Sequence, residues 1–190
     1  MLTRDEIIEK MQATLSKKRF THCLGVEAAA RALAERYDYA DVEKAGLTGL
    51  LHDYAKERTA EDYAKVIDRE GLNPDLKNWS NAVWHGYVGW IIVRDEVGVT
   101  DREMLHAIEV HTVGCAEMSL LDKIVYVADY IEENRDFPGV DDARKIASES
   151  LDAAVAYETV HTVAHLAEKH LPIYPQTIET YNAYIGMLKV

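Results

Sequence analysis

The stretch LLHDYAK, residues 50–56, sets a histidine beside an aspartate inside an otherwise apolar run. Both side chains are costly to bury unless a partner compensates for the water that they lose. The pair His52 and Asp53 therefore predicts a polar site built into the core of the protein, and other residues are needed to complete it.

The composition is that of an ordinary globular protein. The chain has 190 residues, of which 48% are apolar and 28% charged, enough to bury a core in one domain. The start, MLTRDEIIEK, has no signal-peptide pattern, and no apolar run reaches membrane-spanning length. Cys23 and Cys115 form no paired motif, which favours a reducing compartment, and we expect a cytoplasmic protein.

The net charge of −12 disfavours general binding to nucleic acid, which requires a basic surface. It leaves a phosphorylated small substrate open, because metal ions and a few Lys or Arg residues can reverse the potential inside one cleft.

The rest of the chain reads as helices. Capping boxes predict helix starts at Thr3 and Thr100, and Thr59 begins a looser version. Alternating strand patterns and hairpin turns are absent from the sequence. Predicted helices cover about 3–14, 17–37, 41–56, 59–70, 80–97, 101–113, 119–134, 141–149, 150–170 and 175–188. One all-α domain, a helical bundle over residues 1–190, is the simplest interpretation.

Polar residues converge when they are placed on helix faces at about 100° per residue. Taken singly, a histidine on an apolar face is more often a hydrogen-bonded core residue than a ligand. Several together are better satisfied by a shared metal centre of iron, manganese or zinc. His106 falls on the opposite side of its helix, where we expect it to be solvated. The inward-facing residues are His22, His52, Asp53, His85, His111 and Asp129.

A second group of ligand types lies in ETVHTVAH, where Glu158, His161 and His165 have helical spacing. Glu168 continues the same face, and the HExxH pattern of zinc proteases is absent. We interpret this group as a solvated stripe rather than a metal site.

The order His22, then HD at 52–53, then Asp129 resembles the HD-domain superfamily of metal-dependent phosphohydrolases. His85 and His111 resemble the extra histidines of its two-metal branch. From about residue 5 to 185 the chain resembles the YqeK family of bacterial symmetrical diadenosine tetraphosphate hydrolases. After HTVG that family tends to have a basic residue, where this chain has Cys115. The segments that carry the resemblance are RFTHCLGV (19–26), LLHDYAK (50–56), WHGYVGW (84–90), HTVG (111–114) and LDKIVYVADYIEENRDFPGVD (121–141).

The resemblance implies a ligand set. One metal ion would be held by His22, His52, Asp53 and Asp129. Asp53 would bridge to a second ion held by His85 and His111, with iron as the metal that the family suggests. Asp53 and Lys56 would be catalytic, and the substrate contacts would be Arg19, Lys56, Thr112 and Arg135.

These residue types suit hydrolysis of a phosphoanhydride. Two metals about 3.5–4 Å apart lower the pKa of a bridging water and clamp the oxygens of an in-line displacement. A carboxylate such as Asp53 can donate to both ions, and Lys56 can stabilise the charge that develops.

The preferred hypothesis is symmetrical hydrolysis of diadenosine tetraphosphate and related dinucleoside polyphosphates to two nucleoside diphosphates. Another HD-type nucleotide phosphatase or phosphodiesterase, and a non-catalytic nucleotide-sensing module, are the alternatives. We expect a small nucleotide as substrate and neither nucleic acid nor membrane as partner, and we leave a homodimer open.

Overall fold

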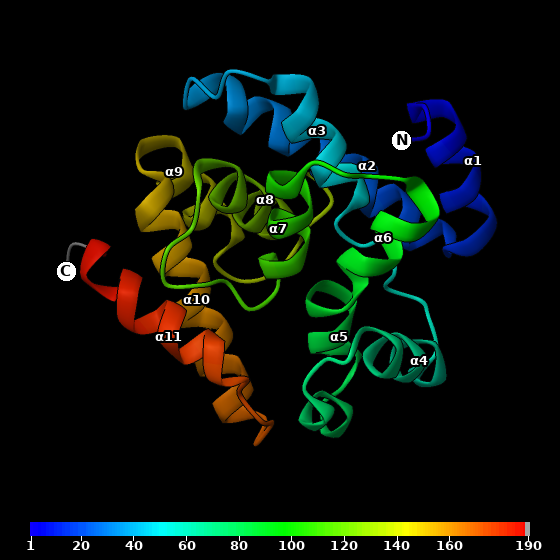
Figure 1. Cartoon of the computed structure of the whole chain (residues 1–190). Helices are drawn as coiled ribbons and strands as arrows, with labels where there is room; N and C mark the ends of the chain where they lie inside the picture. The colour runs from blue at the N-terminus through cyan, green and yellow to red at the C-terminus, as the bar shows by residue number, and fades with distance from the viewer. Residues whose placement is uncertain (189–190) are drawn as a thin grey trace.

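A computed structural model describes residues 1–188, and within that range the chain is helical without a strand (Figure 1). The prediction of an all-α fold is confirmed. The α-helices are α1 (Arg4–Thr14), α2 (Lys17–Arg36), α3 (Val42–Leu51), α4 (Ala60–Glu70), α5 (Asn81–Tyr87), α6 (Gly89–Val97), α7 (Arg102–Val110), α8 (Leu120–Ile131), α9 (Val140–Glu149), α10 (Leu151–Glu168) and α11 (Pro175–Tyr184). Short 3-10 helices follow α4, as η1 (Pro74–Asn78), and α11, as η2 (Ile185–Met187).

Polar side chains begin the helices close to where the sequence predicts. Thr3 and Thr59 each form a capping box with the acidic residue three positions further on. α7 begins after Asp101, one residue later than the capping box at Thr100 predicted. The reason is that the Asp101 carboxylate accepts hydrogen bonds from two backbone N–H groups of the first turn.

The predicted helix 80–97 is divided into α5 and α6, which meet at Val88. A Cβ atom on Gly86 would lie 3.0 Å from a backbone oxygen of α7, so the close packing of these helices requires glycine there. Gly86 lies within α5, two residues before the point at which the two helices meet. The close approach sets the rings of His85 and His111 4.9 Å apart.

The helix that carries the LLHDYAK stretch also differs from the prediction. α3 ends at Leu51, and the chain continues to residue 57 in tight turns. Backbone N–H groups of Tyr54 and Lys56 donate to the carbonyl groups three residues earlier, at 3.0 and 2.9 Å. Such bonds wind the chain more tightly than an α-helix. His52 and Asp53 therefore lie at the end of α3 rather than in the interior of a longer helix.

The central helices α2, α3, α7 and α8 pack against one another and contribute large buried side chains to the core, among them Leu50, Leu51, Ile108, Leu121, Ile124 and Tyr126. α10 packs against α8, α9 and α11. In Figure 1, α4 with α5 and α10 with α11 extend from these central helices on opposite sides of the view. Along residues 1–188 no helix has both the length and the hydropathy needed to cross a membrane.

Candidate metal centre

A first group of donor atoms joins α2, the end of α3 and α8. Nε2 of His22 lies 3.2 Å from Nε2 of His52 and 3.0 Å from Oδ1 of Asp129. Nε2 of His52 lies 3.4 Å from Oδ2 of Asp53. These four residues were predicted to share one ion, and the fold brings all of them together.

A second group forms around the other oxygen of the same aspartate. Oδ1 of Asp53 lies 3.4 Å from Nε2 of His85 and 3.8 Å from Nε2 of His111. The Asp53 carboxylate thus turns one oxygen to each group of histidines. This is the arrangement that a carboxylate bridging two cations needs.

The ring orientation of each histidine is fixed by its Nδ1 atom. Nδ1 of His52, His85 and His111 donates to the backbone carbonyl groups of Gly49, Asn81 and Ile108, at 2.6–2.7 Å. A donated bond from Nδ1 leaves the Nε2 lone pair directed at the cluster. Histidines that bind metals are commonly held in this way.

Three observations show that these residues fit cations. Oδ1 of Asp53 is buried without a hydrogen-bond partner, a cost that a cation would remove. Burial lowers the pKa of His111 to about 4 and that of His85 well below its usual range, so both imidazoles are neutral, as metal ligands must be. Burial also lowers the pKa of His52, but the charges of Asp53 and Asp129 outweigh it and raise that pKa to about 10. The cluster is therefore strongly attractive to positive charge.

Three cationic side chains surround the carboxylates. Nη1 of Arg19 donates to Oδ2 of Asp53 at 2.6 Å, and Arg135 donates to the backbone oxygen of Asp129 at 2.8 Å and also to its carboxylate. Nζ of Lys56 lies 3.0 Å from Nε2 of His85 and 3.9 Å from Oδ1 of Asp53. All three of these predicted substrate contacts lie at the cluster.

The fourth predicted contact, Thr112, lies beside the second group. Its Oγ1 is 2.9 Å from Nε2 of His85 and 3.1 Å from Nε2 of His111. Cys115, three residues further along, lies outside the cluster and bonds through its thiol to the backbone oxygen of Glu117.

Glu132 is a residue that the sequence analysis missed. Its carboxylate is buried and accepts a hydrogen bond from Nδ1 of His22 at 3.1 Å. The other carboxylate oxygen accepts bonds from the backbone and side chain of Asn134, at 2.7 and 2.9 Å. A Cβ atom on Gly25 would lie 2.2 Å from Glu132, so glycine is required for this carboxylate to sit against α2.

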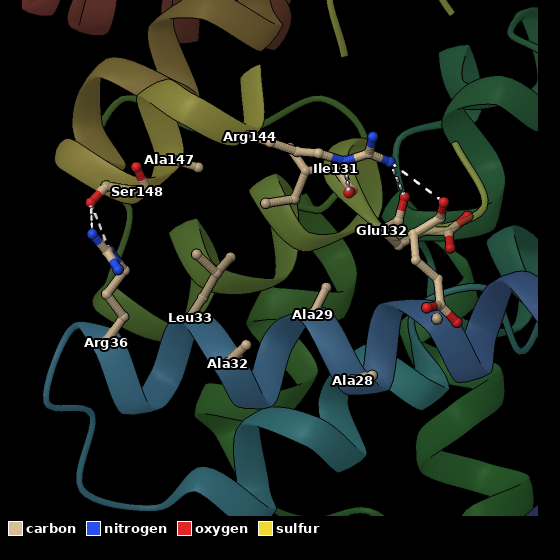
Figure 2. Close-up of a pocket in the computed structure, with 12 residues that line it drawn as sticks. Ala28, Ala29, Ala32, Leu33, Arg36, Ile131, Glu132, Arg144, Ala147 and Ser148 are labelled. Atoms are coloured by element: carbon tan, nitrogen blue, oxygen red, sulfur yellow. Dashed lines mark hydrogen bonds between the residues drawn. The ribbon is translucent and has the colours of Figure 1, made fainter. Parts of the chain in front are cut away.

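Figure 2 shows how the backbone at Glu132 is held. Arg144 of α9 donates to the carbonyl oxygens of Ile131 and Glu132, at 3.0 and 2.8 Å. The groove beside it, between α2 and α9, has a volume of 390 Å³ and is lined mainly by alanines and aliphatic side chains. Arg144 thus holds the segment that carries Glu132, and none of the six predicted metal ligands is among the residues that line the groove.

Glu132→Ala is expected to lower the metal affinity by about 10- to 100-fold, because His22 loses the partner that orients its ring. Competition with a metal-binding dye measures this affinity. Glu133→Ala, at the exposed neighbouring side chain, is the control. Equal affinities in the two variants would show that Glu132 does not position His22.

The predicted solvated stripe on α10 is correct for its histidines and wrong for Glu158. His161 and His165 are exposed, whereas Glu158 is buried and its Oε2 has no hydrogen-bond partner. Glu158 is buried because this part of α10 packs against α8, where Thr159 also bonds to Tyr126 at 3.0 Å. Burial raises the pKa of Glu158 well above its usual range.

His106 is exposed on the outside of α7, as predicted, and its Nδ1 lies 2.9 Å from Oδ2 of Asp122. Cys115 also lies near this pair. Burial raises the pKa of the Cys115 thiol to about 11, so the thiolate form that binds metals is disfavoured. Cys23 and Cys115 are both free thiols.

A basic cleft adjoins the first group of ligands. It has a volume of 720 Å³ and reaches His22. Four of its lining side chains, those of Lys17, Lys18, Arg19 and Arg135, are cationic, in a chain whose net charge is −12. The local potential beside the cluster therefore favours phosphate groups.

Comparisons with known proteins agree with this geometry. A family model described as HD domain matches residues 19–134. The chain is 41% identical to the symmetrical bis(5'-nucleosyl)-tetraphosphatase of Bacillus subtilis (strain 168), covering 95% of this chain and 97% of that protein. It is 37% identical to the protein of the same name from Staphylococcus aureus (strain NCTC 8325 / PS 47), covering 90% and 88% of the two chains.

A solved structure has nearly the same fold. It is that of a predicted HD superfamily hydrolase involved in NAD metabolism from Clostridium acetobutylicum, with a TM-score of 0.92 and 37% sequence identity. The match covers 99% of this chain and 100% of that one. The chain therefore belongs to the HD-domain family, among its members that are similar to the symmetrical bis(5'-nucleosyl)-tetraphosphatases.

Proposed function

We propose that this protein hydrolyses diadenosine tetraphosphate, and related dinucleoside polyphosphates, symmetrically to two nucleoside diphosphates. The observation that carries the proposal is the Asp53 carboxylate, which turns one oxygen to each of two histidine groups amid three cationic side chains. The relatives from Bacillus subtilis and Staphylococcus aureus are named for this activity, and their similarity to this protein extends over nearly the whole chain.

Two metal ions would be held by the ligand set. His22, His52 and Asp129 would bind the first, His85 and His111 the second, and Asp53 both. Imidazole and carboxylate ligands suit iron, with manganese and zinc as alternatives. When bound, such a pair supplies a water of lowered pKa and neutralises charge on phosphoryl oxygens.

The chain's own cations would position the polyphosphate. Arg19 and Arg135 lie between the ligands and the basic cleft, where guanidinium groups can hold two oxygens of one phosphate. Lys56 lies on the side of the second ligand group and can stabilise charge on the phosphoryl group as the anhydride bond breaks. The leaving nucleoside diphosphate is a weak base, so the mechanism assigns it no general acid.

We also propose that residues 1–190 act as one HD-type domain. The basic cleft supports a small nucleotide as the binding partner, because its cationic side chains attract phosphate groups. The overall charge of −12 argues against nucleic acid as a partner. Two free cysteines favour the reducing conditions of the cytoplasm.

The product pattern tests the proposal. Diadenosine tetraphosphate is expected to yield ADP as the sole nucleotide product, because attack falls on a phosphate second from one end of the four. Chromatography of an early time point on the metal-loaded protein measures this. Equal amounts of ATP and AMP would mean asymmetrical cleavage, and AMP or adenosine alone would favour another HD-type phosphatase or phosphodiesterase.

A further inference from the structure

We propose that a cavity between η1 and α5 on one side and α10 and α11 on the other binds one nucleoside of the dinucleotide substrate. The inference rests on the proposed function and assigns a place to a part of the substrate that the metal ligands do not touch. The cavity has a volume of 560 Å³, within the usual range for small-molecule sites. We name it the Trp79 cavity.

The Trp79 cavity opens beside the second ligand group. Thr112 lines it and is also in contact with Nε2 of His85 and of His111. A ligand that occupies the cavity is therefore separated from the metal centre by one side chain. That short separation suits a nucleoside joined to a phosphate at the metals.

The far wall of the cavity is fixed to the loop that carries Thr112. Oγ1 of Thr180 in α11 donates to the backbone oxygen of Val113 at 2.9 Å, and the Gln176 amide donates to that of Gly114 at 2.5 Å. Tyr174, just before α11, packs its ring edge-on against Trp79, with centroids 4.9 Å apart. Defined contacts between α11, the loop of Thr112 and the segment around Trp79 therefore hold the walls of the cavity in place.

The lining is suited to a base and sugar rather than to phosphates. Trp79 and Tyr174 provide aromatic surface, and Leu171, which is 50% exposed, provides apolar surface. Among the described residues that line the cavity none is a lysine or arginine, and Asp75 adds a negative charge. Aromatic side chains bind every base by stacking, whereas phosphates require positive charge.

Hydrogen-bonding groups complete this surface. Asn78 donates its amide to Oδ1 of Asp75 at 2.9 Å, and Ser80, Thr162 and Thr177 also line the cavity. Amides and hydroxyls of this kind fix the orientation of a ligand in an otherwise apolar pocket. The basic cleft on the His22 side has the opposite character. The protein therefore offers one pocket without a cationic lining side chain, beside the second ligand group, and one cationic pocket, beside the first.

A ¹⁹F NMR titration tests the proposal directly. The chain contains three tryptophans, Trp79, Trp84 and Trp90, so 5-fluorotryptophan gives three signals that Trp→Phe variants assign. In the zinc-loaded protein, ADP is expected to shift the Trp79 signal, and pyrophosphate, which lacks the nucleoside, is expected to leave it unchanged. The proposal would be overturned if the Trp79 signal did not shift at saturating ADP, or if it shifted equally with ADP and with pyrophosphate.

A matched pair of variants on α10 gives a second test. Thr162→Phe fills the cavity from its wall, and Ala164→Phe adds the same ring at an exposed position of the same helix. The ADP concentration that half-saturates the Trp79 shift is expected to rise tenfold or more in Thr162→Phe. It is expected to stay within twofold of wild type in Ala164→Phe. Equal values in the two variants would overturn the proposal.

Both tests measure ADP binding and not turnover. A protein that binds ADP in the Trp79 cavity but forms no ADP from diadenosine tetraphosphate would refute the proposed function and keep this site. The reverse result would refute the site alone.

Discussion

Asp53→Asn is expected to abolish hydrolysis of diadenosine tetraphosphate, with turnover lower by about a thousandfold or more. The Asp53 carboxylate is 2% exposed, and its two oxygens face different groups of histidines. Asparagine keeps the size of the side chain but offers one oxygen and an NH₂ group, which cannot donate to a cation. One of the two ions would therefore lose its ligand from residue 53, and the charge that the carboxylate supplies to both ions would be removed. Initial rates and the metal content of the purified protein measure the effect.

Asp142→Asn is the matched control, at an exposed aspartate of α9. It makes the same chemical change and should alter neither the rate nor the metal content. If Asp53→Asn retains more than a small fraction of wild-type turnover, the carboxylate does not bridge the site.

Lys56→Ala is expected to lower turnover by about one to three orders of magnitude, as when a group that stabilises developing charge is removed. Nζ of Lys56 lies at the cluster, yet an ammonium group has no lone pair to donate to a metal. The variant should therefore keep its metal content and its fold. Steady-state kinetics, elemental analysis and circular dichroism separate these effects.

Lys65→Ala is the control for this change, since Lys65 is an exposed lysine of α4 that forms an ion pair with Glu61 on the same helix. Near-normal turnover in Lys56→Ala would make Lys56 a structural residue. Loss of metal together with turnover would show instead that Lys56 maintains the ligand geometry.

The direction of three of the six predicted ligands could be read from the sequence because these three lie on regular helices. His22 and Asp129 lie within α2 and α8, where an apolar stripe marks the side that faces the core. His85 lies within α5 in the same way. For such residues, angular position on a helix determines which way the side chain points, and the sequence alone is sufficient.

Placing residues on helix faces failed where contacts between helices determine the direction or the burial of a side chain. Glu132 follows the end of α8, so no helix face predicted its direction, and its fit against α2 depends on the distant Gly25. A glycine on the inward face of α2 was the one available signal. Glu158 looked like part of an exposed stripe because the crossing of α10 over α8 cannot be read from spacing within α10. The division of helix 80–97 into α5 and α6 at Val88 was also not predicted, since no glycine or proline at that position marks it in the sequence.

Metal counting tests the central claim of a two-metal centre most directly. His85 and His111 belong to the second group, while His22, His52, Asp53 and Asp129 form a complete site for one ion without them. We predict about two metals per chain in the wild type and about one in His85→Ala and in His111→Ala, with activity lost in both variants. His106→Ala, on the outside of α7, should change neither quantity. Elemental analysis of the four proteins gives the metal content. One metal per chain in all four would contradict the two-metal account and would make His85 and His111 core histidines.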